Sequence, residues 1–230
     1  MLPPMTTAHA PAPTFAALDA RAGESALRAL GGFHATPDDE LPTGTETVIL
    51  LGPREPGFWE RFRAAPELAD GRADPLDRWS RRVIGRIACA LGGKALFPFS
   101  GPPWRPFLSW AKRTGRLHAS PVGMLVDREA GLMVSLRGAL ALPARIDLPA
   151  AAPSPCAACA GQPCRTACPV DALGGGEYDV GACRAHLATE AGADCLDAGC
   201  RARRACPISA TYPRDPAQSA FHMRAFTKAP

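Results

Sequence analysis

Eight of the nine cysteines fall between Cys156 and Cys206, in two groups that each end in Cys-Pro. Eight thiolates are the number that two [4Fe–4S] clusters require, and bacterial ferredoxins supply them in runs of the form C-x2-C-x2-C-x3-C-P. The first group departs from that run by a two-residue insertion, Gln162-Pro163, before its third sulfur. The groups consist of Cys156, Cys159, Cys164 and Cys168, and of Cys183, Cys195, Cys200 and Cys206. The spacing therefore predicts two four-iron clusters.

The fourth cysteine of a ferredoxin run binds the other cluster. By this crossing rule, one cluster takes Cys156, Cys159, Cys164 and Cys206, and the other takes Cys168, Cys183, Cys195 and Cys200. The proline after Cys168 and after Cys206 has a mechanical reason. It fixes φ and turns the chain away just after a sulfur has reached the neighbouring cluster.

Two other uses of the cysteines remain open. Zinc binds two sets of four thiolates, although zinc ribbons do not favour a Cys-Pro ending each group. Disulfides suit an even number of cysteines, but such frameworks belong to small secreted domains with a signal peptide. Residues 1–30 have no apolar run of about seven residues behind a basic start, so they do not read as a signal peptide.

Composition is that of an ordinary globular protein, with 230 residues, 47% of them hydrophobic and 21% charged. No stretch of about 18 apolar residues occurs, so we expect no membrane span and no membrane partner. The formal charge of +4 is that of the apoprotein. Each all-cysteine cluster adds about −2, so the loaded protein is expected near neutrality. Cluster chemistry without an export signal indicates the cytoplasm.

Hydrophobic periodicity predicts a mixed α+β chain in five parts. These are a disordered N-terminus (1–13), an α/β domain that binds a cofactor or partner (14–142), a Pro/Ala-rich linker (143–155), a cluster domain (156–212) and a C-terminal tail (213–230). The tail could dock on the cluster domain through Phe221 and Phe226 or be mobile. The expected helices are 14–30, 57–68, 75–91 and 106–114, the expected strands are 45–51 and 94–99, and strands 122–126 and 132–136 are expected to form a hairpin. Helix 75–91 should begin with a capping Asp74 and Pro75 and end at Gly92-Gly93.

The segment from Arg78 to Val126 contains no Asp or Glu but nine basic residues. Such an imbalance indicates an anion: a phosphate-bearing cofactor, nucleic acid or the acidic face of a redox partner. Alternatively, these cations pair with the acidic residues 38–40 and with Asp70. Within the segment we expect Trp79, Trp104 and Trp110 to be core residues rather than base-stacking platforms, and Cys89 to be a small buried hydrophobe.

Three stretches resemble epoxyqueuosine reductases and, more distantly, reductive dehalogenases. They are Trp110–Gly115, Met124–Gly131 and Cys183–Glu190. The two cysteine groups follow Gly131 along the chain, in the order found in that family. The resemblance covers roughly residues 100–210. It implies a nitroreductase-like α/β N-terminal domain that holds a corrinoid (cobalamin), followed by a small ferredoxin-like domain with two clusters that pass electrons to cobalt. Departures are the lack of an acidic residue near Gly101, the missing C-terminal helical repeats and the wider second cysteine group.

The resulting prediction is an iron–sulfur electron-transfer protein with two [4Fe–4S] clusters, a redox partner protein and a corrinoid as the candidate acceptor. The alternatives are a cobalamin-dependent reductase or corrinoid-processing enzyme, and a nucleic-acid-binding iron–sulfur protein. Arg105, His118 and Ser120 are the candidate contacts to a corrinoid or substrate. Arg201, Arg203 and Arg204 flank Cys200 and Cys206 and are expected to raise the potential of the adjacent cluster.

Overall fold

A four-stranded antiparallel sheet forms the centre of the N-terminal half of this mixed α/β fold. The computed structural model describes residues 12–228. The strand order is β1-β2-β6-β3, with bounds β1 Leu27–His34, β2 Thr47–Pro53, β6 Gly138–Leu142 and β3 Lys94–Leu96. Residues 1–11, on which most of the predicted disorder falls, lie outside the described range.

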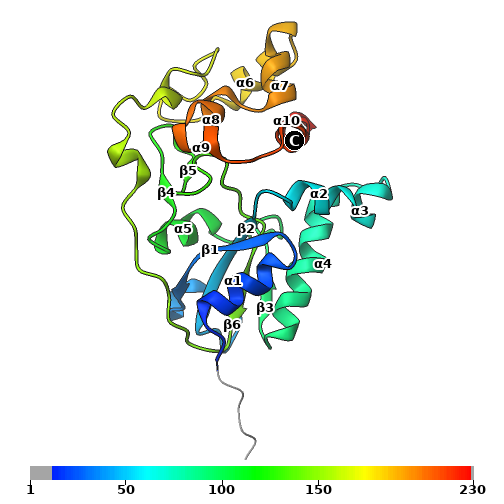
Figure 1. Ribbon diagram of the computed structural model, residues 1–230, viewed down its shortest axis with the longest axis vertical. Coiled ribbons are helices and arrows are strands. Elements are labelled where there is room, and N and C mark those ends of the chain that lie inside the picture. The colour runs from blue at the N-terminus through cyan, green and yellow to red at the C-terminus, as the bar shows by residue number, and fades with distance from the viewer. Residues whose placement is uncertain (1–11, 229–230) are drawn as a thin grey trace, which may run out of the picture.

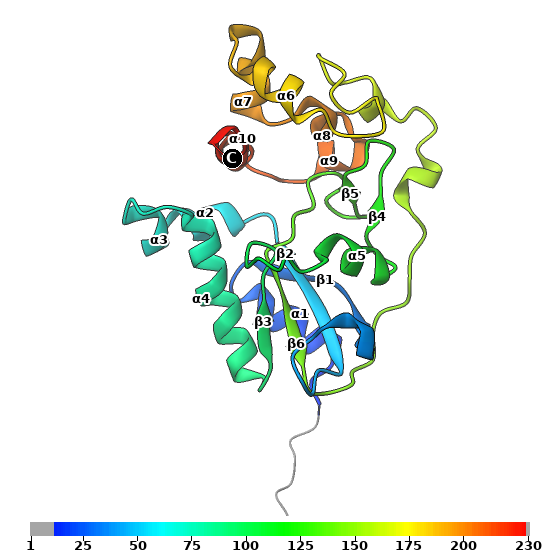
Figure 2. The ribbon, with the colours of Figure 1, turned by 180° about the vertical axis from the view of Figure 1, so that it is seen from behind.

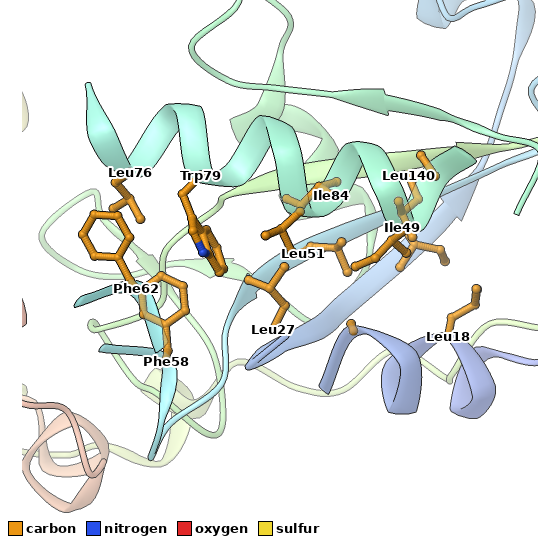
Figure 3. Packing of buried hydrophobic residues seen from close by; sticks show 14 of the residues in the cluster. Leu18, Leu27, Ile49, Leu51, Phe58, Phe62, Leu76, Trp79, Ile84 and Leu140 are labelled. Atoms are coloured by element: carbon orange, nitrogen blue, oxygen red, sulfur yellow. The ribbon is translucent and has the colours of Figure 1, made fainter. Parts of the chain in front are cut away.

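One face of the sheet packs against α1 (Phe15–Gly23) and α4 (Pro75–Ala90), with α2 (Phe58–Arg63) and α3 (Pro66–Ala69) at one end. Figure 3 shows Leu51 of β2 and Ile84 of α4 meeting in this layer. Phe58 stands edge-on to Trp79, with ring centroids 5.4 Å apart. Full burial of each such side chain stabilises the fold by roughly 1.5–3 kcal/mol.

The opposite face packs against α5 (Phe107–Arg113). Phe107 and Trp110 of this helix are buried against the sheet. The rings of Trp110 and Phe33 of β1 lie 5.9 Å apart. The sheet is therefore covered on both sides, which explains why all seven residues of β2 are buried.

Helix α4 has the predicted bounds but not the predicted cap. Pro75 occupies its first turn, and Gly92 follows its C-terminus with φ +65°. Asp74, however, has φ 50° and its side chain makes no capping hydrogen bond. Cys89 is exposed because it falls outside the buried stripe that includes Ile84, Ile87 and Ala88, so its expected burial is wrong.

The predicted helix 14–30 is wrong in its second half. The helix ends at Gly23, and β1 begins at Leu27. Gly31, with φ +127°, lies at a register shift in the pairing of β1 with β2. A Cβ on Gly32 would lie 2.7 Å from the Val48 carbonyl oxygen. The glycine pair thus permits close strand pairing and a bulge rather than ending a helix.

The predicted hairpin of 122–126 with 132–136 is also wrong. Instead β5 (Leu125–Val126) pairs with β4 (His118–Ala119). The Asp127 carboxylate accepts hydrogen bonds from the backbone N–H groups of Glu129 and Ala130, and the Leu132 N–H donates to Ser209 Oγ at 2.8 Å. The Leu132 N–H thus donates outside the expected ladder, and an isolated antiparallel bridge between Asp127 and Gly131 is what pairs there. Strand β6, whose sequence GALAL has low β propensity, was not predicted either.

The cysteine-bearing segment is built from short helices above the sheet (Figures 1 and 2). They are η2 (Pro155–Ala158), η3 (Pro163–Arg165), α6 (Val180–Leu187), η4 (Glu190–Gly192), α7 (Ala193–Ala198), α8 (Arg201–Ala205) and α9 (Pro207–Thr211). A third core cluster joins Val126 and Leu132 to Leu173 and Ala202. This core crosses the predicted linker, and the domain division stays a prediction. Within residues 12–228 no helix combines the length and apolarity needed to cross a membrane.

Helix α10 (Pro216–Lys228) connects both halves of the molecule. It packs against α7, and Phe226 stacks on Tyr178 with ring centroids 6.0 Å apart. On the other side, the Phe221 ring lies 5.5 Å from those of Trp59 and Phe62. The tail therefore docks on the cysteine-bearing segment through Phe226 and on the N-terminal half through Phe221. Figure 1 shows α10 between these two parts of the molecule.

The buried ion pair between Arg28 of β1 and Asp127 should dominate the stability of the 127–131 loop. Both side chains are 9% exposed. We predict that Asp127→Asn lowers the free energy of unfolding by about 3 kcal/mol, because it removes the buried carboxylate that pairs with Arg28 and leaves only the exposed Glu129. Urea unfolding measures this change. Asp197→Asn, which breaks the exposed pair with Arg224, should have little effect; equal losses in both variants would contradict the prediction.

Candidate metal centres

The first set of cysteines surrounds a cavity of about 630 Å³ next to β5. Cys156 lies in η2, Cys164 in η3, and Cys206 at the junction of α8 and α9. Together with Cys159 they line this cavity, and we call them the first quartet. Cys206 comes from the second sequence group, so the chain crosses as the ferredoxin rule predicts.

The second quartet consists of Cys168, Cys183, Cys195 and Cys200, and it lines a separate cavity of about 530 Å³. Cys183 lies in α6 and Cys195 in α7. The structure therefore brings together the eight predicted cysteines in the two predicted sets. Their role as cluster ligands stays a prediction.

Hydrogen bonds distinguish Cys206 from the rest of the first quartet. Burial raises the pKa of the Cys156 and Cys164 thiols. Burial opposes ionisation of Cys206 too, but the backbone N–H groups of Ser209, Leu132 and Ile208 stabilise its thiolate, so its pKa lies below the ordinary value. Cys206 is thus prepared to bind metal as a thiolate.

In the second quartet, burial raises the pKa of both Cys183 and Cys195. The Tyr178 hydroxyl hydrogen-bonds to Cys183, and the Ala172 N–H donates to Cys168 Sγ at 3.3 Å. These thiols also lie close enough to one another for each negative charge to oppose the next. A positively charged occupant would remove that repulsion.

Five basic side chains line the second cavity: Arg201, Arg203, Arg214, His186 and His222. The sequence did not single them out as a set. Arg203 donates to the Leu132 carbonyl and faces Cys200, and Arg214 donates to the Met133 carbonyl at 3.0 Å. Burial, with the nearby charge of Arg203, lowers the pKa of Arg214 to about 10. Burial and the charges of Arg214, Arg137 and Arg203 lower the pKa of His222 to about 3, so its imidazole is neutral near pH 7. Arg214 and His222 carry no spacing signal, because only α10 and its preceding turn bring them to the cavity.

The other two flanking arginines are placed differently. Both Arg201 and Arg204 form ion pairs with Asp194 near the surface. Their charges are therefore compensated by a carboxylate. Arg203 differs from Arg201 and Arg204. It lines the second cavity together with the thiols, and it forms no ion pair with a carboxylate of residues 12–228.

The described cysteines are all free thiols, so no disulfide joins them. Within residues 12–228, no three His, Cys, Asp or Glu side chains are close enough to hold a single metal ion. Four thiolates around one zinc, at bond lengths of 2.3 Å, would lie about 3.8 Å apart. The quartets instead line cavities of several hundred cubic ångströms.

Arg105, His118 and Ser120 do not meet at one of these cavities. The Arg105 guanidinium donates to the Glu40 carbonyl at 3.3 Å. Ser120 lines the cavity of the first quartet, and His118 lies in β4. Within the described chain, His118 Nε2 and Ser120 Oγ are buried without a hydrogen-bond partner. The three predicted contacts thus do not form one corrinoid site.

Several cations of the carboxylate-free segment are paired. Arg78 binds Asp70, Arg82 binds Glu67, and Arg113 binds Asp39. These pairs account for part of the charge imbalance. Trp79 and Trp110 are core residues as predicted, whereas Trp104 is 66% exposed, so that expectation is wrong.

Paired substitutions test the division into quartets. Cys164 and Cys195 are each 6% exposed and form a matched pair. We predict that Cys164→Ala and Cys195→Ala each remove about four of about eight irons after reconstitution. Cys164→Ala combined with Cys206→Ala should lose no more than Cys164→Ala alone, because both residues serve one quartet. Loss of all iron in that double variant, measured by iron analysis, would contradict the crossing.

The position of Arg203 predicts an effect on redox potential. Its positive charge, which no carboxylate of the described chain pairs with, would stabilise the more negative, reduced state of a cluster bound in the second cavity. We expect Arg203→Gln to lower the reduction potential of that cluster, and the control Arg204→Gln to change it little because Asp194 compensates Arg204. EPR-monitored potentiometry measures both. An unchanged potential in Arg203→Gln, or an equal shift in Arg204→Gln, would refute the assignment.

Similarity to known proteins gives no further guide to these centres. Four thiols line each of two cavities, and three arginines and two histidines also line the second one. No family model, no curated protein and no solved structure matches the chain.

Proposed function

We propose that the chain is an iron–sulfur electron-transfer protein that holds two [4Fe–4S] clusters, one in each quartet. The observation that carries the proposal is the grouping of eight cysteines around two separate cavities, with Cys168 and Cys206 each crossing to the other sequence group. Bound four-iron clusters would supply reversible one-electron chemistry. The ferredoxin-like and nitroreductase-like fold assignments and a cytoplasmic location belong to this proposal.

The dimensions of the sites favour clusters over single ions. A zinc site would need its four sulfurs drawn to about 3.8 Å from one another. The thiols of each quartet lie around a cavity, and no compact single-ion group occurs among the described residues. A multi-atom inorganic group bridges such a space without collapse of the surrounding chain.

Charge in the second cavity supports a cluster that has a net negative charge once its four thiolate ligands are counted. Arg203 and Arg214 are half-buried and form no ion pair with a carboxylate of the described chain. An unpaired buried charge is costly. Four thiolates with their cluster carry a net negative charge, which would compensate both guanidinium groups.

The surface beside the second cavity supports docking of a redox partner protein. Leu108 is 64% exposed, Tyr178 43% and Val170 37%, and all three line this cavity. Exposed apolar side chains gathered at one site are typical of interaction surfaces. Electrons would therefore be exchanged at this end of the molecule.

A cobalamin-dependent reductase related to epoxyqueuosine reductases is the second candidate. It depends on the resemblance in residues 100–210, but Arg105, His118 and Ser120 lie at different places. We therefore derive no step through a corrinoid. A nucleic-acid-binding iron–sulfur protein is the third candidate, and the ion pairs of Arg78 and Arg113 leave fewer cations for phosphates.

Metal analysis with a spectroscopic titration tests the proposal. After anaerobic reconstitution we expect about eight irons and about eight sulfides per chain, and EPR signals of reduced clusters that disappear on reoxidation. Cob(II)alamin added to the same sample should keep the EPR spectrum of the free compound. Two zinc ions bound in preference to iron would overturn the proposal, and a stoichiometric change in the cobalt signal would favour the reductase.

A further inference from the structure

A groove on the outer side of the helical layer gathers arginines from three helices. Its volume is about 370 Å³, and it lies between α1, the α2–α3 turn and α4. Its apolar lining comes from Trp79, Val83 and Ile87 of α4. The arginines are Arg21 of α1, Arg61 of α2, and Arg82 and Arg86 of α4. No cysteine of either quartet lines it.

Three of these four arginines have no partner in the described chain. Arg82 binds Glu67. The side chains of Arg21, Arg61 and Arg86 form no hydrogen bond, ion pair or ring contact with any residue of 12–228. They differ in this from Arg78 at the start of the same helix, which is held by Asp70. Of these three arginines, Arg86 belongs to the carboxylate-free segment, whereas Arg21 and Arg61 precede it in the chain.

Charge and shape indicate the ligand. Glu24 is the one carboxylate that lines the groove, so the net charge of its lining is positive. Like charges held together repel one another unless an anion binds between them. A guanidinium group binds phosphate oxygens through two parallel hydrogen bonds. The apolar floor offers a surface for an uncharged part of the same ligand.

We propose that this groove binds a small phosphorylated ligand of nucleotide size. Its volume falls within the range of small-molecule sites, about 300–1,000 Å³. Arg61 and Arg86 bind the phosphate oxygens from two sides, and Arg21 adds a third positive charge. The ligand binds away from both quartets, so the site adds to the proposed electron transfer and does not depend on it.

Calorimetry on the reconstituted full chain tests this site, with ATP, pyrophosphate and adenosine as probes. We expect saturable binding of ATP and pyrophosphate at low ionic strength and none of adenosine alone. Arg61→Gln combined with Arg86→Gln should weaken binding at least about tenfold, because two charge-assisted contacts are lost. Arg63→Gln is the matched control, since Arg63 is an exposed arginine of α2 that does not line the groove.

Comparison of ATP with pyrophosphate separates the affinity that comes from the phosphates from the affinity that comes from the apolar floor. Tighter binding of ATP would assign a role to the apolar floor, and equal binding would restrict the site to the phosphates. Absence of saturable binding for both, or the same loss in Arg63→Gln, would overturn the proposal. So would a single-stranded RNA that binds through Arg61 and Arg86 and is not displaced by ATP. The iron content of the variants shows whether they are folded, because no arginine of the groove contacts a quartet.

Discussion

Cys206 depends on a contact that both halves of the molecule share. Its sulfur accepts hydrogen bonds from the backbone N–H group of Leu132, which follows the 127–131 loop, and from those of Ile208 and Ser209 in α9. Gly131 allows this approach, since a Cβ there would lie 3.0 Å from the sulfur and 2.7 Å from the Ser209 nitrogen. Arg28 holds the same loop through Asp127. The first quartet is therefore complete only when the sheet, the loop and α9 are all in place.

The two cavities differ in what surrounds their sulfurs. The first quartet is held mainly by backbone N–H groups and the Ser154 and Ser209 hydroxyls. The second is also lined by basic side chains, namely Arg201, Arg203, Arg214, His186 and His222. Backbone dipoles are fixed by the fold, whereas side-chain charges change with a single substitution. Two sites with the same ligands would thus differ in redox properties through their surroundings.

Cysteine spacing predicted more of the molecule than hydrophobic pattern did. The crossing of Cys168 and Cys206 follows from a ligand rule, and the helix from Pro75 follows from its apolar stripe. The strand at Gly138–Leu142 could not be recognised, because alanine and glycine become strand residues only through burial between two neighbours. In the sequence, the pair Gly31-Gly32 is typical of the end of a helix, whereas in the structure it lies within β1. Arg214 and His222 reach the second cavity through the packing of α10, which no local pattern records.

Helix α10 also determines when the second cavity becomes enclosed. His222, Met223 and Phe226 contribute to its wall, and Phe221 anchors the helix on Trp59 and Phe62. During translation all eight cysteines leave the ribosome before this helix does. The second cavity therefore gains this part of its wall only after residues 216–228 have been synthesised, and the docked helix would limit the access of dioxygen to the proposed cluster.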